Sequence, residues 1–331
     1  MSFKIEEDIR PRNVFKELLE CCKQDAEYLV KNGEFESIPC PACLTEGDNI
    51  YFVKHGFSYI KCSSCSTLYN SPRPTEATFN KFYTISKSSK YFFESFYPAV
   101  EKSRKDKLIP ERIIRVEQFF QANGNDPFVL LDIGAGQGFF FDLMKENHPE
   151  FEYRVIEPNE SLAEVCKQKG YEAVVDFVEN VRVWKNEVDF IICFEVFEHV
   201  REPRDFLLQL KSFLKPGGKL LITSLSGSGL DIEYLKDEAD IVAPPQHLNF
   251  LSIEGYKSIF NQLGFSNLEI ITPGRLDVNI IMNKLSEKPE LKSDSLIQFI
   301  SSLSDENKDK LQKIAADNLL SSHIWVIATC L

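Results

Sequence analysis

Short apolar runs alternate with amphipathic segments between residues 128 and 224, and this alternation is the strongest pattern in the chain. The run Val188–Phe194 is nearly all apolar, which is typical of a central strand covered on both faces. Other strands are predicted at residues 128–131, 153–156, 172–175 and 219–224, with helices at 161–169 and from Pro203. Strands that alternate with helices predict an α/β fold with a parallel sheet and right-handed crossovers.

The segments on either side of this pattern predict further helices and two more strands. Residues 1 to about 36 carry apolar side chains at helical spacing, and residues 72–124 mix aromatic with basic side chains. Residues 225–251 hold glycines, prolines and His247 and are predicted to form a loop. The remaining predictions are a helix capped by Ser252, a strand at 267–271, about fifty helical and charged residues at 274–322, and a strand at 324–328.

These elements predict four consecutive parts of the chain. They are an N-terminal helix at 1–36, a cysteine-containing region at 37–73, a helical linker or flap at 74–124, and a main domain at 125–331 that includes the helical insertion at about 274–322. The linker either covers a ligand site or packs on the sheet as a plain connection, and the sequence leaves both open.

A glycine-rich loop follows the first strand of the main domain. Asp132 is predicted to end that strand, and Gly134, Ala135, Gly136 and Gly138 precede a helix. A strand, a glycine turn and a helix N-terminus form a nucleotide-binding crevice, because glycines let the backbone approach a ligand and the helix end presents N–H groups. The alternative is a glycine turn that only joins a strand to a helix.

Two later strand ends carry residues that suit a nucleoside. Glu157 comes nineteen residues after Gly138 and can accept hydrogen bonds from a ribose diol; it is followed by Pro158. Asp176 and Phe177 end the third strand, where a carboxylate and an aromatic ring suit an adenine. A helix cap by Asp176 is the alternative.

Four of the nine cysteines have the spacing of a metal site. Cys40 and Cys43 form one C-x-x-C pair, and Cys62 and Cys65 form another after eighteen residues. This spacing predicts a zinc ribbon whose four thiolates fill all positions of a structural Zn²⁺. Coincidental pairs or a redox pair are the alternatives, and the odd total of cysteines argues against a disulfide framework.

The composition narrows the possible partners. The chain has 331 residues, 43% hydrophobic and 27% charged, with a formal net charge of −12. That charge argues against a nucleic acid as the main partner. No apolar run approaches the roughly 20 residues of a membrane helix, and the N-terminal sequence is too charged for a secretory leader, so we expect a cytoplasmic protein.

The motifs LLDIGAGQG, IEP, DFIICFEVFEHV, LKPGG and LLIT, in this order, resemble the class I S-adenosylmethionine-dependent methyltransferases over residues 128–272 and the last strand. With the zinc knuckles, the FY…YFF segment and the ending SSHIWVIA, the chain resembles a bacterial subgroup of zinc-ribbon methyltransferases. Members of that subgroup often act on sugars or other metabolites of cell-surface and secondary-metabolite pathways. The resemblance implies a Rossmann-like sheet of seven strands in the order 3-2-1-4-5-7-6, with the last strand antiparallel.

The resemblance also implies a role for each matching residue in binding S-adenosylmethionine. The residues implied are Asp132, Gly134, Ala135, Gly136 and Gly138 for the methionine part, Glu157 and Pro158 for the ribose, Asp176 and Phe177 for the adenine, and Phe194 and Glu195 for the sulfonium. The helical insertion departs from the plain fold and is expected to be a lid or a dimer surface. A dehydrogenase would explain the glycine loop and the acid, but neither EVFEHV nor the antiparallel strand.

Glu195, Glu198 and His199 would point the same way if this segment were helical, and His247 follows on the later loop. One hypothesis makes His199 or His247 a general base for a hydroxyl or an amine. A second makes Glu195, Glu198, His199 and His247 ligands of Mg²⁺, as in the magnesium-dependent O-methyltransferases of ubiquinone synthesis and of small-RNA ends, which this pattern resembles. A third gives Glu198 and His199 only structural roles.

We therefore expect an enzyme that methylates a small hydroxylated metabolite, such as a nucleotide-linked sugar or a precursor of a cell-surface polysaccharide. An RNA methyltransferase with a zinc knuckle and a non-catalytic binding protein with the same fold are the alternatives. The sequence leaves the acceptor atom open, as well as the choice between a monomer and a homodimer.

Overall fold

The computed structural model describes residues 9–47, 49–120, 128–293 and 295–331, and the chain divides into two compact units. The ribbon unit comprises Met1–Val100, Leu225–Tyr256 and Ile270–Trp325. The sheet unit comprises Glu101–Ser224, Lys257–Glu269 and Val326–Leu331. The expected linker at 74–124 ends among residues outside the described part, and the four-part division stays a prediction.

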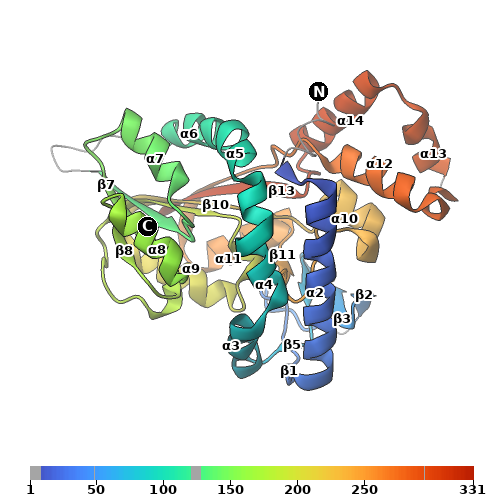
Figure 1. Cartoon of the computed structure of the whole chain (residues 1–331), viewed down its shortest axis with the longest axis horizontal. Coiled ribbons are helices and arrows are strands. Elements are labelled where there is room, and N and C mark those ends of the chain that lie inside the picture. The colour runs from blue at the N-terminus through green and yellow to red at the C-terminus, as the bar shows by residue number, and fades with distance from the viewer. Residues whose placement is uncertain (1–8, 48, 121–127, 294) are drawn as a thin grey trace. The chain divides into compact units, whose positions relative to one another are not determined.

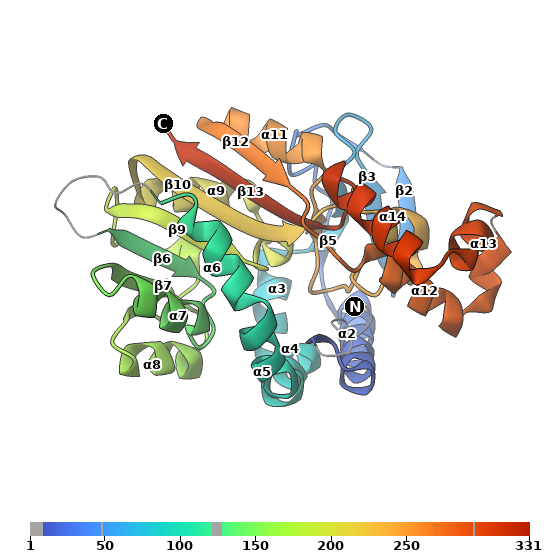
Figure 2. The same cartoon turned by 90° about the horizontal axis from the view of Figure 1, so that it is seen from above.

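Seven strands form a single sheet in the spatial order β12-β13-β10-β9-β6-β7-β8 (Figure 2). The strands are β6 (Val129–Ile133), β7 (Glu152–Ile156), β8 (Glu172–Val174), β9 (Val188–Phe194), β10 (Leu214–Leu225), β12 (Phe265–Ile271) and β13 (His323–Cys330). Counted along the chain, this order is 3-2-1-4-5-7-6, and the last strand is antiparallel. The expected Rossmann-like topology is confirmed.

The centre of the sheet is apolar on both faces. β6 pairs in parallel with β7 on one side and with β9 on the other, and Leu130, Leu131, Ile191 and Ile192 are completely buried. β6 continues through Asp132, which pairs in register with the neighbouring strands, so this residue does not end the strand as predicted. The sheet therefore carries the acid to its carboxyl edge.

Helices cover both faces of this sheet, with α6 and α7 on one face and α9 on the other (Figure 1). The helices concerned are α5 (Tyr97–Lys107), α6 (Ile109–Glu117), α7 (Phe139–Asn147), α8 (Glu160–Gln168) and α9 (Pro203–Phe213). Asn159 caps α8 by accepting from Leu162 N at 3.2 Å. The KPGG sequence after α9 lies inside β10 as a register shift between Leu214 and Lys219.

The ribbon unit is built around a four-stranded sheet in the order β11-β4-β3-β2. Its elements are α2 (Arg12–Asn32), β1 (Phe35–Glu36), β2 (Ile50–Lys54), β3 (Phe57–Lys61), β4 (Leu68–Asn70), β5 (Arg73–Pro74), α3 (Glu76–Ile85), α4 (Lys87–Tyr91) and the π-helix η1 (Phe92–Phe96). The predicted loop at 225–251 is wrong, because it contains α10 (Leu230–Leu235), the 3-10 helix η4 (Lys236–Glu238) and β11 (Asn249–Phe250). These elements are too short to show a period, and β11 exists through its pairing with β4.

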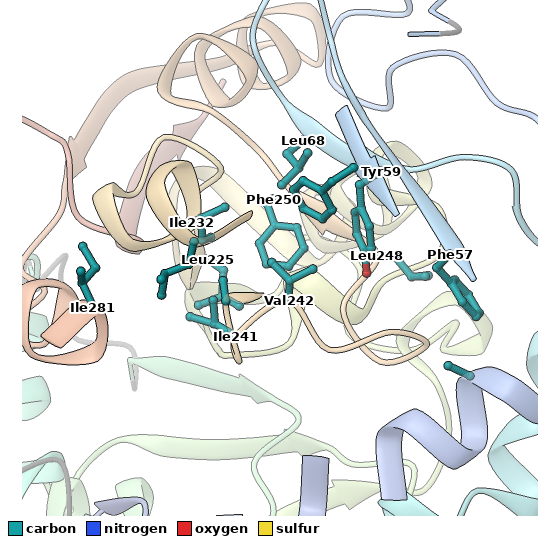
Figure 3. Packing of buried hydrophobic residues seen from close by; sticks show 14 of the residues in the cluster. Phe57, Tyr59, Leu68, Leu225, Ile232, Ile241, Val242, Leu248, Phe250 and Ile281 are labelled. Atoms are coloured by element: carbon teal, nitrogen blue, oxygen red, sulfur yellow. The ribbon is translucent and has the colours of Figure 1, made fainter. Parts of the chain in front are cut away.

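Buried aromatic and aliphatic side chains from distant parts of the chain form the core of the ribbon unit (Figure 3). Tyr59 on β3 lies 6.1 Å from Phe250 on β11, ring centre to ring centre. Leu225 at the end of β10 and Ile281 on α12 belong to the same cluster. The ribbon and the 225–250 segment thus share one core.

The predicted helical insertion consists of α12 (Asp277–Glu287), the 3-10 helix η5 (Pro289–Ser293), α13 (Ser295–Ser302) and α14 (Asp305–Asp317), and it follows α11 (Ile253–Gln262) and β12. Asp277 links the two ends of the insertion. Its carboxylate accepts hydrogen bonds from Gln312 Nε2 and Ser321 Oγ at 2.6 Å and from Ser322 N at 2.7 Å. Among the described residues, no helix is both long and apolar enough to cross a membrane.

Candidate active site

The loop between β6 and α7 depends on glycine at three positions. Gly134, Gly136 and Gly138 have φ angles of +71°, +58° and +74°, which L-residues adopt only with strain. A Cβ at Gly134 would lie 2.7 Å from a methyl group of Val196, so the loop is closed on that side. A Cβ at Gly136 would meet nothing within 4 Å. The open side of the loop is therefore at Gly136.

Glu157 holds the loop from the end of β7. It is buried, and its carboxylate accepts from Gly136 N and from Asn159 N, both at 2.9 Å. Burial raises the pKa of Glu157, although these two hydrogen bonds act in the opposite direction. Each carboxylate oxygen retains a second acceptor site, so Glu157 can hold the loop and still accept from a ligand hydroxyl.

Asp132 is a second buried acid next to the loop, 3% exposed. Burial, together with the nearby charge of Glu157, raises the pKa of Asp132 to about 8, while Arg112 acts against this shift. Two carboxyl groups buried this close to each other favour a ligand that brings positive charge.

The end of β8 holds the predicted adenine residues. Asp176 Oδ1 accepts from Phe177 N at 2.8 Å and from Asn180 Nδ2 at 2.7 Å, and so it braces the 3-10 turn η2 (Val178–Asn180). The side chain of Phe177 is 45% exposed. The structure thus presents an aromatic face here, while Asp176 also has a local structural role.

The segment after β9 does not form an α-helix. Glu195 has a φ of +56°, and Phe197–His199 form the 3-10 turn η3. The condition under which Glu195, Glu198 and His199 would point the same way is therefore not met. A contact with a neighbouring strand prevents the helix. Glu195 N donates to Thr223 O at 3.0 Å and so extends the β9–β10 pairing by one residue before the chain turns. A non-glycine residue in this region is strained, and such strain gathers at functional sites.

The two glutamates of this segment have different surroundings. Glu195 Oε1 accepts from Thr223 Oγ1 at 2.6 Å and from Arg112 Nη2 at 3.3 Å. Glu198 is 2% exposed and accepts from Ser224 Oγ at 2.9 Å. Burial, with Glu195 as the next cause, raises the pKa of Glu198 to about 8.

Arg112 belongs to the site, although no pattern in the sequence assigned a role to it. It lies on α6, and its guanidinium carbon is 4.6 Å from the centre of the Phe194 ring. The only sign in the sequence was that basic residues occur in the helical segment before the first strand. Which basic residue reaches the carboxyl edge of β9 depends on the packing of α6 against α7, which the sequence does not show.

His247 lies in the ribbon unit, whereas Glu198 and His199 lie in the sheet unit. His247 Nδ1 is 2.6 Å from the carbonyl oxygen of Ile241. A carbonyl can only accept, so Nδ1 carries the proton in the neutral ring and Nε2 carries the lone pair. This is the tautomer that a base or a metal ligand acting through Nε2 requires.

The four predicted zinc ligands come together in the ribbon unit. Cys40 Sγ lies 3.6 Å from Cys65 Sγ, Cys43 Sγ lies 3.5 Å from Cys62 Sγ, and all four sulfurs lie within 4.8 Å of one another. Zn–S bonds of about 2.3 Å in a tetrahedron place sulfurs about 3.8 Å apart. This four-cysteine cluster therefore fits Zn²⁺ and leaves no ligand position open.

The two knuckles have the same backbone design. Leu44 and Ser66, each next after the second cysteine, have φ angles of +63° and +61°. Two residues after that cysteine, Thr45 Oγ1 lies 3.2 Å from Cys43 Sγ and Thr67 Oγ1 lies 3.3 Å from Cys65 Sγ. No role was predicted for these threonines, although the spacing C-x-x-C-x-T occurs twice in the sequence.

Comparison with known proteins identifies the family. The profile of a family described as "Methyltransferase domain" matches residues 105–270, half of the chain. The chain belongs to this methyltransferase family. Together with the strand order, the match establishes the class I fold of S-adenosylmethionine-dependent methyltransferases.

This methyltransferase is similar to proteins of different specificity. It is 24% identical to a malonyl-[acyl-carrier protein] O-methyltransferase of Paenibacillus over 46% of its own length and 60% of the relative's. It is 31% identical to the mitochondrial ubiquinone biosynthesis O-methyltransferase of Schizosaccharomyces pombe over 29% of its length and 38% of the relative's. The chain thus spans less than two thirds of these relatives. A crystal structure of a SAM-dependent methyltransferase from Archaeoglobus fulgidus aligns with 71% of this chain and all of that one, with 21% identity and a TM-score of 0.49.

The loop of this methyltransferase fits the adenosyl cofactor that its fold implies. The open space at Gly136 would let the ligand approach the backbone of the loop closely. Asp132 and Glu157 supply hydrogen-bond acceptors beside it. Phe177 at the end of β8 supplies an exposed ring. All of these residues lie in the sheet unit.

Proposed function

We propose that this methyltransferase transfers a methyl group from S-adenosylmethionine to a small hydroxylated metabolite, such as a nucleotide-linked sugar or a precursor of a cell-surface polysaccharide. The main support is the open glycine loop at Gly136, flanked by the buried carboxyl groups of Asp132 and Glu157. The cofactor supplies a methyl group on a positively charged sulfur. Two buried acids are the surroundings that such a cation favours.

Each residue of the loop region then has a task. Asp132 and the three glycines hold the methionine part, and Glu157 accepts from the ribose while it keeps Gly136 in place. Phe177 packs on the adenine, and Asp176 orients the turn that carries the ring. Phe194 and Glu195 line the position of the sulfonium. Glu195 is kept in position by Thr223 and Arg112, so its carboxylate does not have to be ordered when the cofactor binds.

The acceptor side uses the histidines. A hydroxyl must lose its proton as the methyl group moves, and His199 or His247 is proposed as the base. The hydrogen bond from His247 Nδ1 to Ile241 O supports His247, because it leaves the lone pair on Nε2. The second candidate role is that of Mg²⁺ ligands, made by Glu195, Glu198, His199 and His247, with the cation lowering the pKa of the acceptor.

An oxygen acceptor agrees with the relatives, since both curated proteins described above are named O-methyltransferases. RNA is the less favoured acceptor, because the net charge of −12 opposes binding to a phosphate backbone. We further propose that Zn²⁺ in the four-cysteine cluster is structural. We also propose that the helical insertion is a lid or a dimer surface, and that the protein is cytoplasmic.

The donor half of the proposal is tested by calorimetry. We expect purified protein to bind S-adenosylmethionine and S-adenosylhomocysteine, and Glu157→Gln to weaken both by about tenfold or more. Glu160→Gln, on the first turn of α8, is the control and should bind like the wild type. No heat with either compound, together with binding of a nicotinamide dinucleotide, would overturn the proposal.

The acceptor half is tested by turnover. A panel of hydroxylated sugars, nucleotide sugars and RNA is assayed with labelled donor. The assay is then repeated with a chelator that spares tightly bound zinc, followed by added Mg²⁺. If turnover is lost with the chelator and restored by Mg²⁺, we infer that the glutamates and histidines of the site bind the cation. If the chelator leaves turnover unchanged and His247→Asn loses turnover, we infer that His247 is the general base.

A further inference from the structure

The ribbon unit contains a cavity of about 290 Å³ that the methyl-transfer proposal does not use. Its walls come from α2, the tip of the β2–β3 hairpin, the segment after α10, and α12. No residue that lines it belongs to the seven-stranded sheet or to the glycine loop. Six of the lining residues carry charge, namely Lys54, Lys284, Lys288, Asp237, Glu238 and Asp240.

Two of the three lysines are already neutralised. Lys284 pairs with Asp240, and Lys288 Nζ lies 2.6 Å from both carboxylate oxygens of Glu238. Lys284 lies in the last turn of α12 and Lys288 directly follows that helix, so both lie at its C-terminal end. The cavity is thus bordered on one side by two ion pairs whose ammonium groups are fixed in place.

Lys54 differs from both. Its Nζ donates to the carbonyl oxygen of Ala239 at 2.7 Å, and within the described part of the chain it has no ion-pair partner. An ammonium group has three donors, so one carbonyl satisfies a third of its capacity. Burial lowers the pKa of Lys54 to about 8, with Lys284 adding to the shift against the nearby acids. The cavity thus contains a positive charge that the protein leaves only partly compensated.

An anion is the ligand that would complete this arrangement. Lysines act as separate point charges and suit the oxygens of a phosphate, whereas a planar carboxylate is matched better by arginine. A cavity of about 290 Å³ is at the small end of ligand pockets, which favours a small ligand. We propose that this cavity binds the phosphate group of a small metabolite through Lys54, assisted by Lys284 and Lys288.

The first test is titration with inorganic phosphate at pH 7, against chloride at equal ionic strength, with thermal unfolding and calorimetry as readouts. We expect phosphate to raise the melting temperature of the wild type, because a ligand that binds only the folded state stabilises it. In Lys54→Met the phosphate response should fall at least tenfold, while stability in chloride stays equal or increases, since a buried charge is removed. Lys313→Met, at an exposed ion pair on α14, is the matched control and should respond like the wild type.

A second variant separates binding from a purely structural role. Asp240→Asn frees Lys284 from its partner and should tighten phosphate binding severalfold. If the lysines only hold the fold together, Asp240→Asn lowers the melting temperature and leaves the phosphate response unchanged, which would overturn the proposal. A response to acetate equal to that for phosphate, or a full response in Lys54→Met, would overturn it as well.

The pH dependence gives a third readout that does not require a variant. The charged or titratable groups around Lys54 are Asp237, Glu238, Asp240, Lys284, Lys288, His55 and Cys22. Burial lowers the pKa of His55, so its ring does not supply the positive charge at pH 7. Phosphate affinity should therefore weaken as the pH rises through 8 and Lys54 loses its proton. A constant affinity from pH 8 to about 9.5, where phosphate stays a dianion, would contradict the role of Lys54.

Discussion

The four-cysteine cluster and the acidic segment after β9 are both short motifs, yet the sequence defines the first far better than the second. Each knuckle closes within six residues through its own hydrogen bonds, such as Leu44 N to Cys40 O at 2.8 Å and Ser66 N to Cys62 O at 2.9 Å. The acids at Glu195 and Glu198 instead take their positions from Thr223, Ser224 and Arg112. A site held by local bonds can be predicted from spacing, whereas one held by distant residues cannot.

The largest effect is expected when one ligand is removed from the cluster. Cys62→Ser leaves three sulfurs, and structural zinc contributes on the order of 10 kcal/mol to the folding of small zinc domains. We expect zinc to be lost and the ribbon unit to unfold at a much lower temperature, as measured by metal analysis and circular dichroism. Cys21→Ser, at a cysteine outside the cluster, should keep both properties. A zinc-free Cys62→Ser protein with an unchanged melting curve would contradict a structural metal.

The next effect concerns the pH dependence of cofactor binding. In the fold, the pKa of Asp132 is raised from its ordinary value of 3.8 to about 8, mainly by burial. A cationic ligand favours the ionised carboxylate, so S-adenosylmethionine should bind up to about tenfold more tightly per pH unit from pH 6 to 8 and level off above.

The same shift has the opposite sign for stability. Between pH 4 and 8 the unfolded chain ionises Asp132 while the fold keeps it protonated, so the free energy of unfolding should fall as the pH rises. Asp132→Asn should flatten both profiles. Calorimetric titrations and denaturant unfolding at pH 6, 7 and 8 check this, and an unchanged pH profile in Asp132→Asn would rule out the assignment.

A smaller effect concerns the glycine loop, where two alanine variants share the same backbone strain but differ in the room available for the new side chain. Gly134→Ala and Gly136→Ala both place a side chain at positive φ, which costs about 1–2 kcal/mol. Gly134→Ala also meets Val196, so it should be the less stable of the two. Gly136→Ala fills the open side and should lose more cofactor affinity relative to its loss of stability. Equal effects of both variants on affinity would show that the ligand does not approach at Gly136.

The smallest effect is expected at the supports of the acidic segment. Thr223→Val removes the hydroxyl that donates to Glu195 and should cost about 1 kcal/mol, with a modest loss of turnover. Thr329→Val, on a half-buried position of β13, controls for loss of a hydroxyl elsewhere in the sheet. If turnover is unchanged while stability falls, Thr223 supports the fold and not the site.

The sequence predicted the elements whose signal is local. The apolar run of β9 and the glycine loop both occur as expected. The positive φ of Glu195 was not predictable, because it results from the bond to Thr223 O, twenty-eight residues away. For the same reason, the role of Arg112 and the strand β11 were missed, since each depends on a partner distant in the chain.

One consequence of β11 concerns the newly made chain on the ribosome. Asn249 and Phe250 pair with Tyr69 and Leu68, and so complete the edge of a sheet whose other strands end at residue 70. During synthesis, the outer edge of β4 stays unpaired until about 180 further residues have been made. At roughly 5–20 residues per second, this takes on the order of ten seconds or more. An unpaired edge invites pairing with other chains. If Zn²⁺ binds Cys62 and Cys65 early, it would fix the neighbouring strand β4 before β11 is made, so cells starved of zinc should accumulate this protein as aggregates.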